Sequence, residues 1–139
     1  MTPARQHSAT GRHVVGAFFL VMGGVHLGIV AADPQFYDGF ATGGLFPFVR
    51  EGWDHVVMAR PAVYGLLLMA GEVTLGTALL LGGRTARFGW AGVILFHVLL
   101  MLFGWGVWLW SVPALAILVP LAAHDLRPVS PEAALQGAA

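Results

Sequence analysis

The sequence predicts an all-α protein: an up-down bundle of four transmembrane helices, with a structured outer loop between the first and second helices. Two observations predict this class. Of the 139 residues, 58% are hydrophobic and only 10% are charged, whereas about a quarter of the residues in soluble proteins are charged. The apolar residues are also grouped into runs of about 20, the length that a helix needs to cross the hydrocarbon core of a bilayer.

Charge and cysteine content exclude several classes of function. Seven basic and seven acidic residues give a formal net charge of zero, so we expect no broad basic surface and no nucleic-acid partner. The chain has no cysteine, which excludes disulfide exchange, thiolate nucleophiles and sulfur ligands for a metal. The lipid bilayer is the first expected partner.

The first predicted span is residues 14–32, which follows a cytoplasmic N-terminal segment, residues 1–13. His26 is its only polar side chain, within the sequence GVHLG, whose small residues four positions apart let another helix approach closely. A secretory signal is the competing interpretation, because the sequence VAA before Asp33 resembles a cleavage site. The run is longer than the roughly 7–15 apolar residues of such a signal, which favours a span.

The predicted outer loop, residues 33–60, mixes aromatic residues, glycines and charges without a regular period. Its part with the sequence FATGGLFPFV is apolar enough to dip back toward the bilayer. Irregular backbone is tolerated there only where protein covers it or where it lines a cavity. We therefore expect this loop to be structured and to cap the bundle.

The other spans are predicted at residues 61–83, 88–105 and 109–123, which complete a transmembrane domain of residues 14–123. Pro61 suits the first turn of a helix. The sequence RTAR, residues 84–87, is short enough to be a turn that makes the second and third spans antiparallel neighbours.

The turn between the third and fourth spans is predicted between Gly104 and Ser111, because glycines and a serine ahead of Pro113 interrupt the apolar run there. The tail, residues 124–139, has no apolar face to bury. We expect this tail to be mobile and cytoplasmic.

The arginines predict the orientation. Five fall on one side of the predicted spans: Arg5, Arg12, Arg84, Arg87 and Arg127. Only Arg50 and Arg60 fall on the other side. The positive-inside rule then places both termini in the cytoplasm and the protein in the inner (plasma) membrane.

Four of the five tryptophans fall at the outer interface: Trp53, Trp105, Trp108 and Trp110. They form either an aromatic belt at the depth of the headgroups or a vestibule in which a flat ligand stacks.

Three spans each place one ionisable group near the middle of the bilayer. At 1.5 Å per residue, His26 lies roughly 4.5 Å outward of the centre of its span. Glu72 is the central residue of the second span, and His97 is near the centre of the third. An isolated charge at this depth costs several kcal/mol, and the spans contain no lysine or arginine to pair with it. The three residues therefore form either a polar clasp that holds helices together or a functional site.

Three kinds of site fit His26, Glu72 and His97. Two histidines and a carboxylate are a known ligand set for a divalent metal, and two histidines on different helices are able to ligate a haem. The third kind holds the head of a lipophilic, quinone-like molecule, with Glu72 and His97 handling protons. Around it, the ligand-binding candidates of the outer interface are Trp53, His55 and Trp105. His55, beside Asp54, either gates the site from above or is simply solvated.

Residues 71–95, GEVTLGTALLLGGRTARFGWAGVIL, resemble the signature of the second and third helices of DoxX-like membrane proteins. The sequence LVMGGVHLG, followed by FATGGLFPF, is similar to the first helix of that family and the loop behind it, and the sequence GWGVWLWSVPALAIL looks like related four-helix bacterial proteins. The resemblance implies a four-helix membrane protein, associated in some members with quinone-linked sulfur oxidation or membrane redox complexes. It carries over to Glu72 and, less directly, to His26.

From these observations we expect a small redox-linked membrane component that binds a quinone-like molecule. A redox partner subunit and a second copy of the chain are its possible protein partners. The first alternative is a non-catalytic partner or assembly subunit whose polar residues are structural. The second alternative is a metal- or haem-binding membrane protein.

Overall fold

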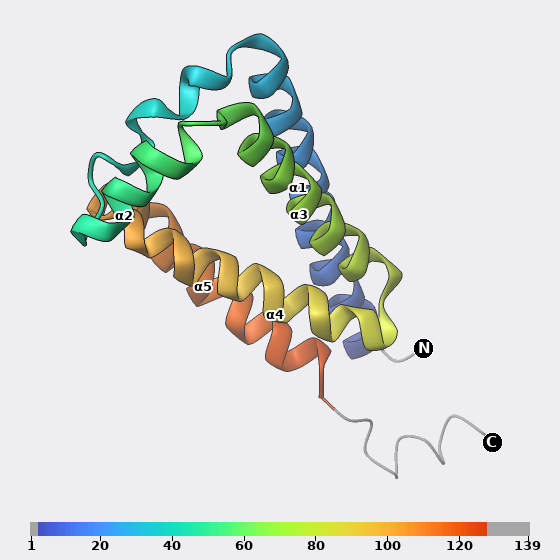
Figure 1. Cartoon of the computed structure of the whole chain (residues 1–139). Helices are drawn as coiled ribbons and strands as arrows, with labels where there is room; N and C mark the ends of the chain where they lie inside the picture. The colour runs from blue at the N-terminus through green and yellow to red at the C-terminus, as the bar shows by residue number, and fades with distance from the viewer. Residues whose placement is uncertain (1–2, 128–139) are drawn as a thin grey trace, which may run out of the picture.

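The computed structural model describes residues 3–127, and no strand occurs among them (Figure 1). The long helices are α1 (Pro3–Ala32), α3 (Pro61–Leu81), α4 (Gly83–Leu100) and α5 (Trp105–Asp125). Short helical segments connect them: η1 (Pro34–Ala41), α2 (Pro47–Gly52), η2 (Trp53–Val57) and η3 (Met101–Phe103). The prediction of an all-α fold is confirmed.

Four stretches are long and apolar enough to cross a membrane: Ala9–Ala32, Pro61–Leu81, Gly83–Phe103 and Trp105–Asp125. Their side chains are mostly exposed to the surroundings rather than buried in the protein, as expected when lipid is the solvent. The chain is therefore a multi-pass membrane protein in contact with the bilayer. The up-down order of the spans and the identity of the membrane stay predictions.

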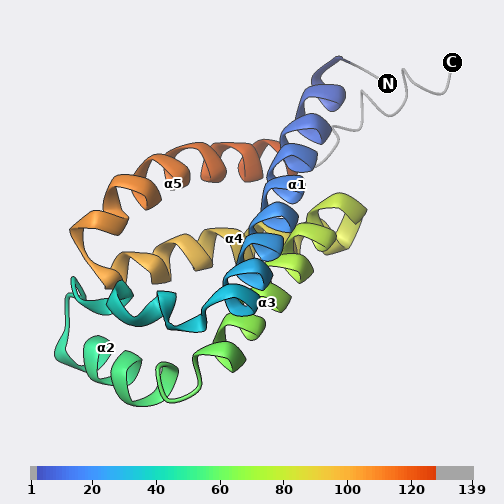
Figure 2. The ribbon, with the colours of Figure 1, turned by 90° about the horizontal axis from the view of Figure 1, so that it is seen from above.

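The long helices pack in the order α1, α3, α4, α5 and back to α1. The pair α1 and α3 approaches the pair α4 and α5 at the end of the molecule that carries both termini, and the two pairs diverge toward the other end (Figures 1 and 2). Residues 33–60, which we call the cap, bridge the diverging ends (Figure 1). The predicted loop is thus a helical segment that closes the wide end.

The turn after α3 is shorter than the sequence predicted. The prediction of a turn at residues 84–87 is wrong, because these residues form the first turns of α4. Gly82 alone separates the two helices, at φ 73°. Glycine adopts this conformation without strain, and a Cβ atom on Gly82 would also lie 2.9 Å from the guanidinium group of Arg12.

The turn before α5 lies at Gly104, the first residue of the predicted interval. Gly104 has φ 96°, and the backbone of Gly43 in the cap packs directly against the position where its Cβ would be. The amide of Leu45 donates a hydrogen bond to the carbonyl oxygen of Leu102 at 2.9 Å. The cap is therefore fixed to this turn by backbone contacts.

The ends of the chain differ from the predicted segments. α1 begins at Pro3, so most of the predicted N-terminal segment is helical. His124 and Asp125, which were assigned to a mobile tail, are the last residues of α5. Residues 128–139 of that predicted tail lie outside the described residues.

Glycines set the close approach of α1 and α3. A Cβ atom on Gly76 would lie 2.7 Å from the carbonyl oxygen of Gly16, and one on Gly16 would lie 3.0 Å from that of Gly76. Gly23 also faces α3, whereas Gly24 and Gly28 have nothing within 4 Å of their Cβ positions. The predicted helix contact at the sequence GVHLG is therefore wrong, since its two glycines point away from the bundle.

Three helices are joined at the narrow end by polar contacts around Asp125, which we call the Asp125 clasp. The guanidinium group of Arg12 in α1 donates to both carboxylate oxygens of Asp125, at 3.2 and 3.4 Å. The indole nitrogen of Trp90 in α4 donates to the same carboxylate at 2.9 Å. Trp90 belongs to the buried apolar core, together with Phe19, Leu79, Ala86, Val93, Leu118 and Ala122.

We expect Asp125→Ala to lower the free energy of unfolding by about 2 kcal/mol, because it leaves two donors without their acceptor. Thermal unfolding in detergent, followed by circular dichroism, measures this loss. His124→Ala is the matched control, since His124 is exposed on the same turn of α5. Equal losses in the two variants would contradict a stabilising role for the Asp125 clasp.

Candidate functional site

Three polar side chains meet between α1, η1 and α3. The Nδ1 atom of His26 lies 2.7 Å from the hydroxyl oxygen of Tyr37, and its Nε2 atom lies 3.6 Å from Oε1 of Glu72. The rings of His26 and Tyr37 stack, with their centroids 5.8 Å apart and their planes at 22°. We call His26, Tyr37 and Glu72 the polar cluster. It brings together two of the three midplane residues that the sequence singled out.

The start of the cap places Tyr37 over His26. Asp33 caps η1, with its carboxylate oxygen accepting from the amide of Gln35 at 2.9 Å. The turn of η1 carries Tyr37 back toward α1, and the indole nitrogen of Trp53 donates to the carbonyl oxygen of Tyr37 at 2.9 Å. Gly65 of α3 leaves room for the phenol ring, because a Cβ atom there would lie 2.9 Å from Cε2 of Tyr37.

Glu72 is the deepest member of the polar cluster. Glu72 is only 3% exposed. Its Oε2 atom has no hydrogen-bond partner among the described residues. Both contacts of His26 are satisfied when the Tyr37 hydroxyl donates to Nδ1 and the Nε2–H group faces Glu72. Buried polar atoms normally have a hydrogen-bond partner. Oε2 of Glu72 is an exception, and it is therefore available to accept a hydrogen bond.

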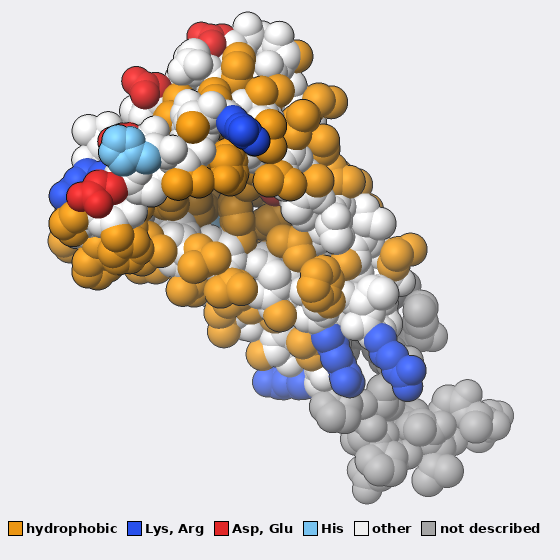
Figure 3. Space-filling view, in the orientation of Figure 1, with side chains coloured by type: hydrophobic (Ala, Val, Ile, Leu, Met, Phe, Trp, Pro, Cys, Tyr) orange, Lys and Arg blue, Asp and Glu red, His pale blue; other side chains and the backbone are white. Residues whose placement is uncertain are grey.

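A cavity of about 160 Å³ adjoins the polar cluster. Its lining residues come from the cap and α3: Tyr37, Trp53, Val57, Tyr64, Gly65 and Leu68. Figure 3 shows the surface hollowed beneath the cap, between α3 and α4. Tyr37 belongs to both the cavity wall and the polar cluster, so a molecule in the cavity lies against the residue that contacts His26.

His97 does not join the polar cluster. It is 3% exposed, and its ring packs edge-on against Phe19 and Phe96, with centroids 6.1 and 5.6 Å away. Its Nδ1 atom donates to the carbonyl oxygen of Val93 at 2.8 Å. In the described part of the chain it forms no hydrogen bond or ion pair with His26 or Glu72.

No three histidine, aspartate or glutamate side chains gather as a metal-ligating group among residues 3–127. The ligand set of two histidines and Glu72, which the sequence offered for a metal, is therefore not formed in this arrangement. The two histidines offered to a haem contact Tyr37 and Val93 through Nδ1, and Nε2 of His26 faces Glu72 at 3.6 Å.

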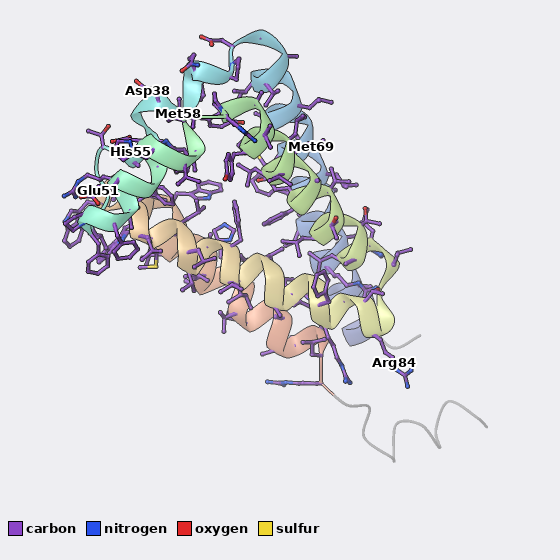
Figure 4. All side chains as sticks on the ribbon, viewed as in Figure 1. Asp38, Glu51, His55, Met58, Met69 and Arg84 are labelled. Atoms are coloured by element: carbon purple, nitrogen blue, oxygen red, sulfur yellow. The ribbon has the colours of Figure 1, made fainter. Side chains whose placement is uncertain are left out.

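The three candidate residues of the predicted outer interface lie in different surroundings. Trp53 lines the cavity and packs against Phe40 and Phe103, with centroids 5.3 and 5.2 Å away. His55 is exposed on the cap (Figure 4). Trp105 is 74% exposed and packs on Trp108 rather than on the cavity. The structure thus places Trp53 beside the polar cluster and leaves the other two apart from it.

Sequence reasoning missed both tyrosines of the chain. Tyr37 and Tyr64 are the only two, and both line the cavity. They lie in the loop and near the start of a span, where counting depth along the apolar runs gives no information. The pair Asp33-Pro34, which starts a helical turn, was the available signal that the chain folds back toward α1 at this point.

Burial raises the pKa of Tyr37 above its ordinary value of 10, and the negative charge of Glu72 raises it further. The folded state therefore favours the neutral phenol: its contribution to stability is complete below pH 10 and is lost as the pH rises through the higher pKa. We expect the phenolate absorbance that Tyr37→Phe removes to have its midpoint above pH 10. Absorbance titration in detergent measures this. A midpoint at or below pH 10 for the absorbance lost in Tyr37→Phe would contradict the expectation.

The chain matches no family model, no curated protein and no solved structure. What the fold and the site define is a class: a multi-pass, all-α membrane protein with a buried polar cluster beside a small aromatic-lined cavity.

Proposed function

We propose that this protein is a small DoxX-like membrane component that binds the head of a lipophilic, quinone-like molecule in the cavity and passes protons through the polar cluster. The observation that carries the proposal is the position of Tyr37, which lines the cavity and contacts His26, which in turn faces Glu72. The resemblance of residues 71–95 to DoxX-like proteins supports the same proposal, since it carries over to Glu72.

The size and chemistry of the cavity suit one ring with its tail outside. Pockets for whole drug-sized molecules occupy about 300–1,000 Å³, so a cavity of about 160 Å³ holds a single ring. Tyr37, Trp53 and Tyr64 offer aromatic faces for stacking on a flat ring. The Tyr37 hydroxyl is able to donate to a carbonyl oxygen of the ring when His26 carries its proton on Nδ1 and donates it to the hydroxyl oxygen.

The polar cluster supplies proton transfer rather than electrons. Reduction of a quinone to a hydroquinone takes up two electrons and two protons, and the side chains described here hold no electron donor. The electrons would come from a redox partner subunit. Each proton would pass from Glu72 through the His26 ring to Tyr37, along contacts of 3.6 and 2.7 Å.

The proposed location is the inner (plasma) membrane with both termini in the cytoplasm. Arg84 and the other basic side chains at the narrow end support this orientation (Figures 3 and 4), because positive charge accumulates on the cytoplasmic side. The acidic side chains of the cap would then face outward, and the polar cluster would extend from the outer end of α1 to the middle of α3.

Binding of a short-chain quinone to the purified protein tests the proposal. Glu72→Gln removes the charge and proton-accepting capacity of the cluster while keeping its shape. Because Glu72 acts on the cavity through His26 and Tyr37, we expect affinity to fall about tenfold, which corresponds to about 1.4 kcal/mol of binding free energy. Glu51→Gln is the matched control, because Glu51 is exposed on the cap. Equal affinity for wild type and Glu72→Gln would overturn the proposal.

A second candidate function is a partner or assembly subunit without a ligand. One observation favours it: His26 and Glu72 bridge α1 and α3 directly, as a clasp between helices does. In that case the same substitution would alter stability and leave quinone binding absent in every variant.

A further inference from the structure

The cap carries large apolar side chains that lie outside all four candidate spans. Phe48 is 65% exposed and Phe46 is 47% exposed, and their rings stack with centroids 5.5 Å apart. Leu45, immediately before them, is exposed as well. Water would surround this group in a soluble protein at a considerable cost in free energy, because each ring presents a large apolar surface.

Charged side chains lie above the apolar ones at the tip of the cap (Figure 3). Arg50, Glu51, Asp54 and His55 are all exposed. Figure 3 shows charged side chains on the upper surface at the tip of the cap and hydrophobic side chains gathered beneath them. Figure 4 places Asp38, Glu51 and His55 along the cap. Within a short stretch, polar and apolar groups are therefore separated in space.

Backbone contacts hold this segment at the ends of two spans. Leu45 donates to Leu102, one residue before the end of the span Gly83–Phe103. Gly43 packs against Gly104, which precedes the span Trp105–Asp125. The segment is braced in turn by Arg50, whose guanidinium group donates to the carbonyl oxygen of Gly44 at 2.5 Å. The exposed rings thus begin where these two spans meet.

We infer that residues 45–51 lie in the boundary between headgroups and hydrocarbon, with Phe46 and Phe48 inserted into lipid. The occupant of this apolar surface is the bilayer itself, and the charged side of the segment faces the headgroups and water. Amphipathic segments with aromatic residues on one side bind membrane surfaces in this way. The cap is accordingly an interfacial anchor in addition to the four spans, and this inference does not depend on the proposed function.

The absence of cysteine from the chain allows a direct test by single-cysteine labelling. Phe48→Cys and its control Glu51→Cys, both at exposed positions, would carry a nitroxide in vesicles of phosphatidylcholine and phosphatidylglycerol. Collisions with oxygen, which concentrates in lipid, and with a water-soluble nickel chelate report the surroundings of each label.

We expect the label at 48 to collide mainly with oxygen and the label at 51 mainly with the nickel chelate, so that the order of the two collision rates inverts between these positions. Nickel-dominated collisions at both positions would overturn the inference, because the rings would then face water. Protection of the label at 48 from both reagents would overturn it as well, since a protein surface would then cover the rings. Phe46→Cys provides a second label on the same apolar surface.

Discussion

Gly76→Leu is expected to lower the free energy of unfolding by about 3 kcal/mol, the upper part of the usual range for overpacking. A Cβ atom added at this position would lie only 2.7 Å from the carbonyl oxygen of Gly16, so a leucine side chain would force α1 and α3 apart. The same helix pair holds His26 and Glu72 in contact, so separation also opens the polar cluster. Thermal unfolding in detergent, followed by circular dichroism, measures the loss.

Gly71→Leu is the matched control on the same helix. A Cβ atom on Gly71 would have nothing within 4 Å, and an apolar leucine side chain is stable on a helix surface that faces lipid. We expect this variant to unfold within about 0.5 kcal/mol of the wild type, as surface substitutions usually do. Equal losses of unfolding free energy in Gly76→Leu and Gly71→Leu would show that close packing against Gly16 is not the reason for glycine at position 76.

The four spans could be predicted because lipid imposes a length and a composition on any helix that crosses it. Helix ends could not be predicted with the same accuracy. Hydropathy locates where the hydrocarbon ends, whereas a helix continues for as long as its backbone hydrogen bonds do. This difference explains why α1 begins at Pro3 rather than at residue 14, and why residues 84–87 are helical although three of the four are polar.

The polar cluster could be predicted only in part, for a geometric reason. Depth along a span can be counted from the sequence, and this count grouped His26 with Glu72, whose side chains lie 3.6 Å apart. Rotation about the helix axis cannot be counted in this way, so His97 was grouped with them although its ring packs against Phe19 and Phe96. Tyr37 lies outside the spans, and its approach to His26 depends on the turn at Asp33.

A double-mutant cycle on the polar cluster separates its structural role from its proposed function. We expect His26→Leu and Glu72→Leu each to lower the free energy of unfolding by about 3 kcal/mol, because removing one partner leaves the other buried without it. The variant with both substitutions should lose clearly less than the sum of the two, since neither His26 nor Glu72 is then left without the other. The Tyr37 hydroxyl loses its contact with His26 in this variant as it does in His26→Leu. Strictly additive losses would mean that the 3.6 Å contact contributes nothing to stability.

Quinone binding by the same variants then distinguishes the two candidate functions. If the polar cluster is only a clasp between α1 and α3, the double variant recovers stability and none of the variants, nor the wild type, binds a short-chain quinone. If the cluster serves a ligand, the double variant recovers stability but still binds at least tenfold more weakly than the wild type. Recovered stability without recovered binding is therefore expected only if the cluster serves a ligand. Leucine restores packing but provides neither the Oε2 acceptor of Glu72 nor a ring that supports Tyr37.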